Sequence, residues 1–273
     1  MKHYLLSSVS LFVAITFLVT ACNNNKEVTK EPKLKEEKIT YTIDGNSMDG
    51  YVVYDENIKG KRPSILVVHE WWGLNDYPEM RARELAKMGY FAFAVDMYGN
   101  GKRADNPTDA QNLATPFYMD PQMAKKRLDA ALSKLNDFSQ ADTNKVAAIG
   151  YCFGGGVLLN SVRLGEKMLG VVSFHGSLVG TAANKDLLKT KILICHGADD
   201  QFVKQQEVDL FKTQMDSIGA DYTFKTYPGA THSFTNPNST AVGKKFNLPI
   251  AYNAAADSAS WIDMKNFFDK IFR

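Results

Sequence analysis

The fold is constrained most strongly by residues 150–156, which read GYCFGGG. They lie between a short apolar strand, Lys145–Ile149, and a helical pattern that begins at Val157. A strand that turns directly into a helix forces its corner residue into a strained backbone conformation, and flanking glycines give the turn its clearance. The thiol of Cys152 is therefore expected at the tip of a strand–turn–helix corner.

A thiol at such a corner has the surroundings of a nucleophile. The first amides and the positive dipole end of the helix favour a thiolate and can bind a developing oxyanion. The alternative interpretation is that Cys152 is a small buried apolar residue whose neighbouring glycines only let a helix approach a sheet. The nucleophile interpretation requires the rest of the chain to supply a base, an acid and a second oxyanion donor.

The N-terminus is typical of a targeting segment, because Lys2 and His3 precede an apolar stretch that ends in Thr20-Ala21-Cys22. Residues 19–22 resemble a bacterial lipobox, which implies a signal peptide over 1–21 and lipidation of Cys22. An ordinary secretory signal or an uncleaved anchor is the alternative, although the stretch is short for a spanning helix. We expect an exported lipoprotein of the cell envelope, anchored to the membrane through that lipid.

Residues 22–38 are predicted to be a flexible polar tether, because Lys and Glu alternate there with almost no apolar residue. Residues 39–273 are then left for a single α/β domain. The net charge is only +2 and the basic residues are scattered, so nucleic acid is not indicated as a partner. A small neutral or weakly charged substrate fits this charge pattern better, and the oligomeric state is not predicted.

Apolar runs alternate with amphipathic patterns along the remaining chain. A hairpin is predicted over 39–54, and the predicted later strands are 64–68, 91–95, 146–149, 170–174, 191–195 and 222–227. Helical patterns cover 78–88, 106–115, 121–138, the region of 208–218 and the C-terminus. Uninterrupted apolar strands alternating with helices predict a mostly parallel sheet with helices on both faces.

Four of the predicted strands end in polar residues, at 69–70, 152, 196–200 and 227–232. In a parallel sheet these ends face the same rim, where chemistry is usually found. After Cys152 the chain offers Asp199 or Asp200 as an acid and then His232 as a base. Nucleophile, acid and base in this order are typical of the α/β-hydrolase fold.

Four motifs resemble those of the dienelactone hydrolase family, also called carboxymethylenebutenolidases. They are HEWWGLN at 69–75, GYCFGG at 150–155, HGxxDxxV at 196–203 and AxHSF at 230–234. The resemblance runs from about Ile39 to the C-terminus and implies an α/β-hydrolase that opens a lactone or ester through an acyl-enzyme. It implies that Cys152 is the nucleophile, His232 the base, Asp200 the acid and Glu70 a regulator of the thiol.

The resemblance also implies that the backbone amides of Trp71 and Phe153 form the oxyanion hole, in agreement with the usual placement of such donors. Trp72 and Asn236 are expected in the substrate pocket. The family's dienelactone hydrolases carry an Arg at the position of Asn236, which helps to hold the carboxylate of the substrate. This departure argues against dienelactone itself as the substrate.

Histidines at 69, 175, 196 and 232 all follow predicted strands, so a zinc site has to be considered. The ligand spacings typical of zinc are missing, and we expect no metal and no cofactor. Cys195 is expected to be an inert core thiol. The favoured function is hydrolysis of a small ester, lactone or thioester; the alternatives are a catalytically idle lipoprotein that binds a small ligand in the same pocket, and a peptidase of similar fold.

Overall fold

The computed structural model describes Met1 and residues 31–273, so the predicted signal peptide and Cys22 lie outside the described residues, apart from Met1. Residues 32–273 form one compact unit. Its single sheet has the strand order β1-β2-β4-β3-β5-β6-β7-β8. Pairing is antiparallel between β1, β2 and β4 and parallel from β4 to β8. The predicted mostly parallel α/β-hydrolase architecture is thereby confirmed.

The strands are β1 Leu34–Ile43, β2 Asn46–Asp55, β3 Arg62–Val68, β4 Phe91–Val95, β5 Ala141–Tyr151, β6 Gly170–Phe174, β7 Lys191–Gly197 and β8 Tyr222–Tyr227. The helices are α1 Asp76–Lys87, α2 Pro107–Met119, α3 Pro121–Lys134, the short 3₁₀ helix η1 Leu135–Asp137, α4 Phe153–Arg163, α5 Gln205–Ser217, α6 Ser239–Phe246 and α7 Ala254–Ile271. None of the helices in the described part of the chain is long and apolar enough to cross a membrane.

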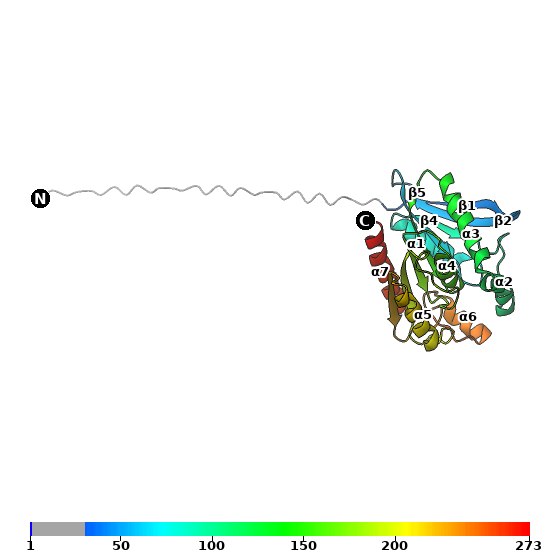
Figure 1. The fold of residues 1–273 in the computed structure, drawn as a ribbon. Coiled ribbons are helices and arrows are strands. Elements are labelled where there is room, and N and C mark those ends of the chain that lie inside the picture. Colours follow the sequence, from blue (N-terminus) through cyan, green and yellow to red (C-terminus); the bar gives the residue numbers. More distant parts are fainter. Residues whose placement is uncertain (2–30) are drawn as a thin grey trace. The chain divides into compact units, whose positions relative to one another are not determined.

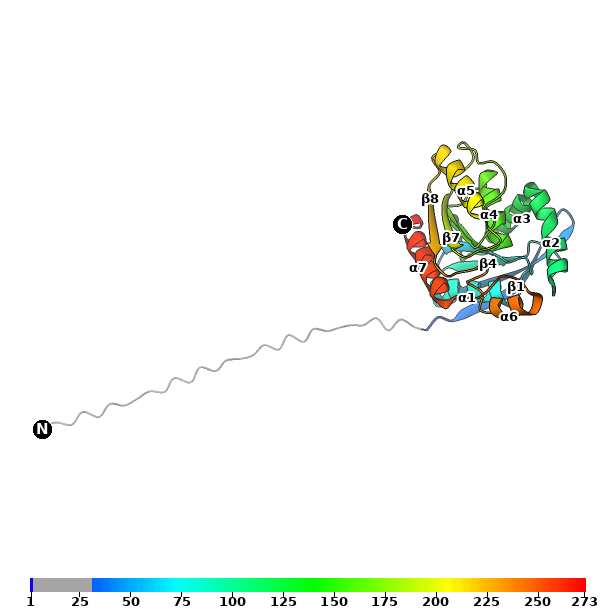
Figure 2. The same ribbon diagram turned by 90° about the horizontal axis from the view of Figure 1, so that it is seen from below.

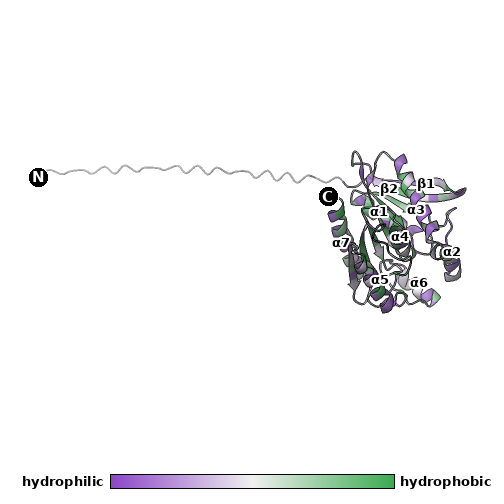
Figure 3. Ribbon diagram, in the orientation of Figure 1, coloured by the Kyte–Doolittle hydropathy of each residue, from purple (hydrophilic) through white to green (hydrophobic). Residues whose placement is uncertain are grey.

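The helices form a layer on each face of the sheet, as Figures 1 and 2 show together. One core contains Leu85 of α1 and Phe268 of α7. The other contains Leu128 of α3, Leu158 of α4 and Phe211 of α5. The strands between these cores carry apolar residues on both faces, and Figure 3 shows the hydrophobic residues gathered on the sheet and on α4. This burial explains why the central strands are continuous apolar runs rather than alternating ones.

The N-terminal hairpin is longer than predicted. Asp44 and Gly45 form its turn with positive φ angles of 49° and 75°, as a tight two-residue hairpin turn requires. However, β1 begins at Leu34, which pairs with Asp55, so the predicted tether boundary at residue 38 is wrong. Of the charged residues that suggested a tether, those at 35–38 lie on this edge strand, where charges are tolerated and discourage further strand pairing.

The largest further differences from the prediction concern two helices. The helix after Cys152 begins at Phe153 rather than Val157, so three glycines form its first turn. The short helix α6 was not predicted at all; it ends at Phe246 and is capped by Asn247, which has a left-handed backbone. The start of α4 and the whole of α6 were missed because glycine or polar residues leave these segments without the apolar periodicity that indicates a helix.

Candidate active site

The corner between β5 and α4 has the expected strained geometry. Cys152 has φ 51° and ψ −111° and caps the N-terminus of α4. A side chain at Gly150 would overlap the backbone of Gly154, and one at Gly154 would overlap the carbonyl of Val68. The amide of Gly154 donates to the carbonyl oxygen of His69 at 3.1 Å. The glycines therefore allow α4 to begin directly against the end of β3.

The backbone of the corner is hydrogen-bonded to His175, which the sequence had suggested only as a possible zinc ligand. The amide of Cys152 donates to the carbonyl oxygen of Phe174 at 3.0 Å and to Nδ1 of His175 at 3.2 Å. The other ring nitrogen of His175 lies 2.7 Å from the hydroxyl of Thr235. Burial and the nearby charge of His232 hold the pKa of His175 well below its usual value. His175 is therefore neutral, accepts from Cys152 and donates to Thr235.

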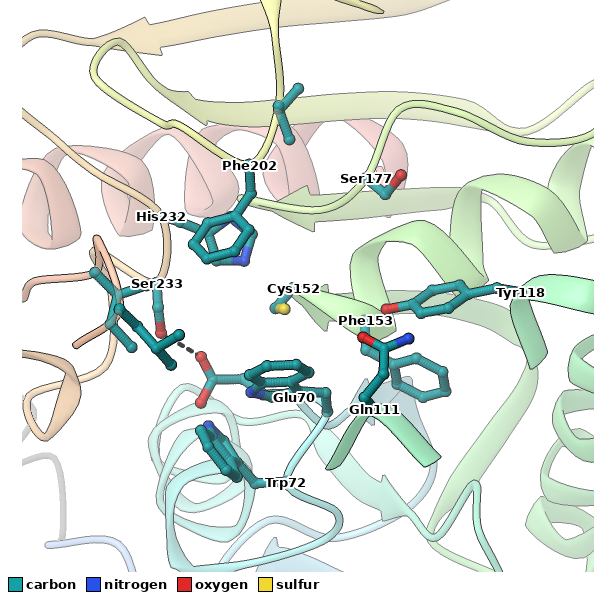
Figure 4. A pocket seen from close by; sticks show the side chains of 14 residues that line it. Glu70, Trp72, Gln111, Tyr118, Cys152, Phe153, Ser177, Phe202, His232 and Ser233 are labelled. Atoms are coloured by element: carbon teal, nitrogen blue, oxygen red, sulfur yellow. Dashed lines mark hydrogen bonds between the residues drawn. The ribbon is translucent and has the colours of Figure 1, made fainter. Parts of the chain in front are cut away.

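The predicted acid and base meet beside the thiol. His232 donates from Nδ1 to Oδ2 of Asp200 over 2.8 Å. The second oxygen of Asp200 accepts from the backbone amides of Phe202 and Val203 at 2.8 and 3.2 Å. In contrast, the side chain of Asp199 is exposed. Figure 4 shows the imidazole of His232 beside the Cys152 sulfur, so the structure brings together Cys152, His232 and Asp200.

The electrostatics of His232 suit a base that holds a proton. Burial lowers its pKa, but the negative charge that Cys152 carries when it is ionised and the hydrogen bonds to Asp200 and Cys152 outweigh that effect. The pKa of His232 is consequently raised well above its usual value. A proton removed from the thiol can therefore remain on His232 while Cys152 reacts.

Two backbone amides are available as oxyanion donors. In the described part of the chain, neither Trp71 nor Phe153 donates its backbone N–H to a protein acceptor. Trp71 follows β3, and Phe153 is the first residue of α4. Their positions are those expected for a donor after an early strand and a donor after the nucleophile.

The thiol opens into a small cavity of about 180 Å³. Trp72, which was predicted in the substrate pocket, lines it together with Trp71 and Phe153. Figure 4 shows Tyr118 of α2 and Phe202 on different sides of the sulfur. The remaining lining residues are Glu70, Gln111, Cys152, Ser177, Val203, His232, Ser233, Leu248 and Ile250. Five of the lining residues lie outside the four sequence motifs, so no motif marked them: Gln111 and Tyr118 of α2, Ser177, Leu248 and Ile250.

Glu70 lines the same cavity and is buried. One of its oxygens accepts from the hydroxyl of Ser233, and the other accepts from Nδ2 of Asn236 at 2.7 Å. Ser239 donates in turn to the Ser233 hydroxyl at 2.8 Å. Burial raises the pKa of Glu70, although the hydrogen bonds from Ser233 and Asn236 oppose that rise. Glu70 is thus held by neighbours of His232 and is not hydrogen-bonded to Cys152.

The prediction that Asn236 lies in the substrate pocket is wrong. Its side chain does not line the Cys152 cavity; it borders a neighbouring cleft on the far side of Trp72. The amide group of Asn236 points inward to Glu70, and its oxygen accepts from the backbone of Asn238 at 3.0 Å. The nitrogen and the oxygen of the Asn236 side-chain amide are therefore both hydrogen-bonded within the protein.

The strand-end histidines have separate hydrogen-bonding roles. His69, for example, is bonded to the carbonyl of Glu70 and accepts from the amide of Met97 at 3.2 Å. Among the described residues, no group of three or more His, Cys, Asp or Glu is placed to hold a metal ion. Cys195 is fully buried in β7, where burial raises the pKa of its thiol to about 12.

The sheet, the strained corner and the order of Cys152, Asp200 and His232 define an α/β hydrolase. An alpha/beta hydrolase enzyme from a deep-sea metagenome library shares this fold with a TM-score of 0.61 and 16% sequence identity, covering 88% of this chain and 98% of that one. Residues 48–272 match the sequence profile of the dienelactone hydrolase family, and the chain belongs to this family. It is accordingly a hydrolase of small molecules.

Two relatives are more similar in sequence. A protein of Aquifex aeolicus named "Putative carboxymethylenebutenolidase" is 31% identical over 213 residues, which are 73% of this chain and 87% of the relative. A dienelactone hydrolase-like promiscuous phosphotriesterase from metagenomic libraries is 33% identical, with a TM-score of 0.82 over 87% of this chain and 98% of that one.

Proposed function

We propose that this protein is a carboxylic ester hydrolase that cleaves a small ester, lactone or thioester through an acyl-enzyme on Cys152. The observation that carries the proposal is the convergence of a strained, half-buried thiol with the pair His232–Asp200 at 2.8 Å. The intact set of nucleophile, base and acid does not favour a catalytically idle binding lipoprotein. A nucleophile that forms an intermediate divides one difficult displacement into two easier ones.

In the first half-reaction, His232 takes the thiol proton and the Cys152 sulfur attacks the carbonyl carbon. The carbonyl π electrons move onto oxygen, and that oxyanion accepts from the amides of Trp71 and Phe153. When the C–O or C–S bond to the leaving group breaks, His232 returns its proton to the leaving oxygen or sulfur. The acyl group is then a thioester on Cys152.

In the second half-reaction, His232 removes a proton from a water molecule, whose oxygen attacks the thioester carbonyl. The same two amides bind the second oxyanion. Collapse of this intermediate releases the carboxylic acid and returns the proton to Cys152. Asp200 holds Nδ1 of His232 protonated throughout, so that the other ring nitrogen can accept and donate the proton.

We expect a covalent intermediate to be detectable on Cys152. Rapid acid quenching after mixing with 4-nitrophenyl butyrate should trap a butyryl group, because acid protonates His232 and stops the attack of water. Intact-protein mass spectrometry measures the added mass, and peptide mapping locates it. Prior alkylation with iodoacetamide should prevent the addition. Butyrylation at a serine, or hydrolysis that survives complete alkylation of Cys152, would contradict the proposal.

We propose further that Glu70 restrains the thiol. It shares the cavity with Cys152, and an ionised carboxylate there disfavours a neighbouring thiolate. Glu70→Gln should increase the rate of Cys152 alkylation by iodoacetamide at pH 6 and the rate of inactivation by hydrogen peroxide, each about tenfold. Unchanged rates of both reactions would show that Glu70 has no such role.

We also propose that the chain is exported and anchored through a lipid on Cys22, on the strength of residues 19–22 in the sequence. Expressed in a bacterium, the full chain should incorporate a radiolabelled fatty acid and partition into detergent. Cys22→Ala should abolish the label while the hydrolase activity remains. A soluble, unlabelled parent chain cleaved elsewhere would rule the anchor out.

A further inference from the structure

Among the described residues that line the cavity in front of Cys152, His232 is the only side chain that can carry a positive charge, and it is already paired with Asp200 and Cys152. Of the fourteen described residues that line the cavity, none is Lys or Arg. Seven are large and apolar or aromatic: Trp71, Trp72, Tyr118, Phe153, Phe202, Leu248 and Ile250. The ionisable groups in the lining are the Cys152–His232 pair, the phenol of Tyr118 and the carboxyl group of Glu70.

The Arg and Lys side chains nearest to the cavity have other partners or border another cleft. Arg81 influences Glu70 electrostatically, but its guanidinium is bonded to Asp257 at 2.5 Å and to the carbonyl of Thr235 at 2.7 Å, and it does not line the cavity. Arg103 and Lys245 border the separate cleft beyond Trp72. No free cation among the described residues therefore reaches the acyl group of a bound substrate.

A carboxylate on the acyl part of a substrate would be poorly accommodated in this cavity. It would lose its water among aromatic and aliphatic side chains, without a partner of opposite charge. It would also lie in the same small space as Glu70 and the oxyanion that forms on the substrate carbonyl. A protonated Glu70 would relieve part of the repulsion but would still supply no positive charge.

We propose that the Cys152 cavity selects esters and lactones whose acyl part is uncharged and apolar, and discriminates against those whose acyl part carries a carboxylate. This selectivity rests on the hydrolase function proposed above and narrows its substrate class. The cavity volume of about 180 Å³ fits an acyl part of the size of a short alkyl chain or a single ring, because an apolar cavity of about 150 Å³ holds one benzene molecule.

A pair of nearly isosteric lactones tests the selectivity: carboxymethylenebutenolide and its primary amide, which differ mainly in one negative charge. Binding is measured by titration calorimetry on the Cys152→Ala protein, and kcat/KM is measured on the parent protein by loss of lactone absorbance. We expect the amide to bind at least about 30-fold more tightly than the acid and to be turned over at least about 100-fold better, because the repulsion grows with the oxyanion.

Gln111 provides a site for a compensating charge. It is an exposed residue of α2 whose side chain lines the cavity, as Figure 4 shows. The amide-to-acid ratio is the preference for the amide lactone over the acid lactone, in binding affinity and in kcat/KM. Gln111→Arg should lower this ratio by about tenfold, because the guanidinium can pair with the carboxylate. Gln111→Met is the matched control of similar length without charge and should leave the ratio unchanged. Glu70→Gln should also narrow the ratio, and effects on the thiol cancel because both lactones share the chemical step.

Each outcome decides the proposal. An amide-to-acid ratio within about threefold of one, or a preference for the acid, would overturn it. A large ratio that neither Gln111→Arg nor Glu70→Gln narrows would also overturn it, since shape rather than charge would then be responsible. Because binding to Cys152→Ala requires no turnover, the selectivity can fail or stand independently of the hydrolase function. That function fails separately if 4-nitrophenyl butyrate is not hydrolysed by the parent protein in a Cys152-dependent manner.

Discussion

Cys152→Ala is expected to abolish ester hydrolysis, with a loss in kcat/KM of at least about 10⁴-fold. The alanine leaves no atom that can form the covalent bond, and the remaining groups could only assist direct attack by water. The fold should survive, because the side chain of Cys152 is only partly buried. The melting temperature should change by less than about 4 °C. Steady-state kinetics with 4-nitrophenyl butyrate and thermal unfolding of the same preparation measure the two effects.

Cys195→Ala is the matched control for this substitution. Cys195 is fully buried in β7, and its thiol accepts from the hydroxyl of Tyr227 at 3.5 Å. Its replacement should lower the free energy of unfolding by about 1–2 kcal/mol, since a small cavity is left, while most of the activity remains. Near-normal turnover by the Cys152 variant, or loss of turnover in a folded Cys195 variant, would mean that the wrong thiol was assigned.

The parts of the fold that were predicted well are those where burial dictates the sequence. The predicted bounds of β4 and β6, whose residues are all buried, agree with the structure. The bounds of the mostly exposed edge strand β8 also agree. The start of α4 was missed because glycines lower helix propensity, yet at Gly154 only glycine permits the approach to β3. There a tertiary requirement overrides the local signal.

The grouping of Cys152, Asp200 and His232 could be predicted because it depends on topology. Parallel strands bring their carboxyl ends to one rim, so β5, β7 and β8 place Cys152, Asp200 and His232 together whatever the details of their loops. The direction in which Asn236 points depends instead on a contact with Glu70, which lies 166 residues earlier in the chain. Likewise, the hydrogen bond from Cys152 to His175 joins residues 23 positions apart, and the φ of 41° at His175 is encoded by no local pattern.

Asp200→Asn is expected to reduce kcat by about 10⁴-fold. The carboxylate accepts from Nδ1 of His232 at 2.8 Å, which leaves the other ring nitrogen free to take the thiol proton. An asparagine can keep its oxygen on the amides of Phe202 and Val203 and turn its NH₂ group toward His232. The imidazole would then carry its proton on the nitrogen that faces Cys152 and could not act as a base.

Asp199→Asn separates this electrostatic role from a general effect of losing a carboxylate in the same loop. The side chain of Asp199 is exposed, and only its backbone amide is bonded, to the carbonyl of Ala230 at 2.9 Å. This variant should therefore keep kcat within about twofold of the parent value, since exposed substitutions of this kind have small effects. The pH dependence of kcat should likewise remain that of the parent in Asp199→Asn but not in Asp200→Asn, where His232 has lost the partner that helps to raise its pKa. If Asp199→Asn were the more damaging change, the acid of the triad would be Asp199, and the orientation of His232 described above would not be the one that acts in catalysis.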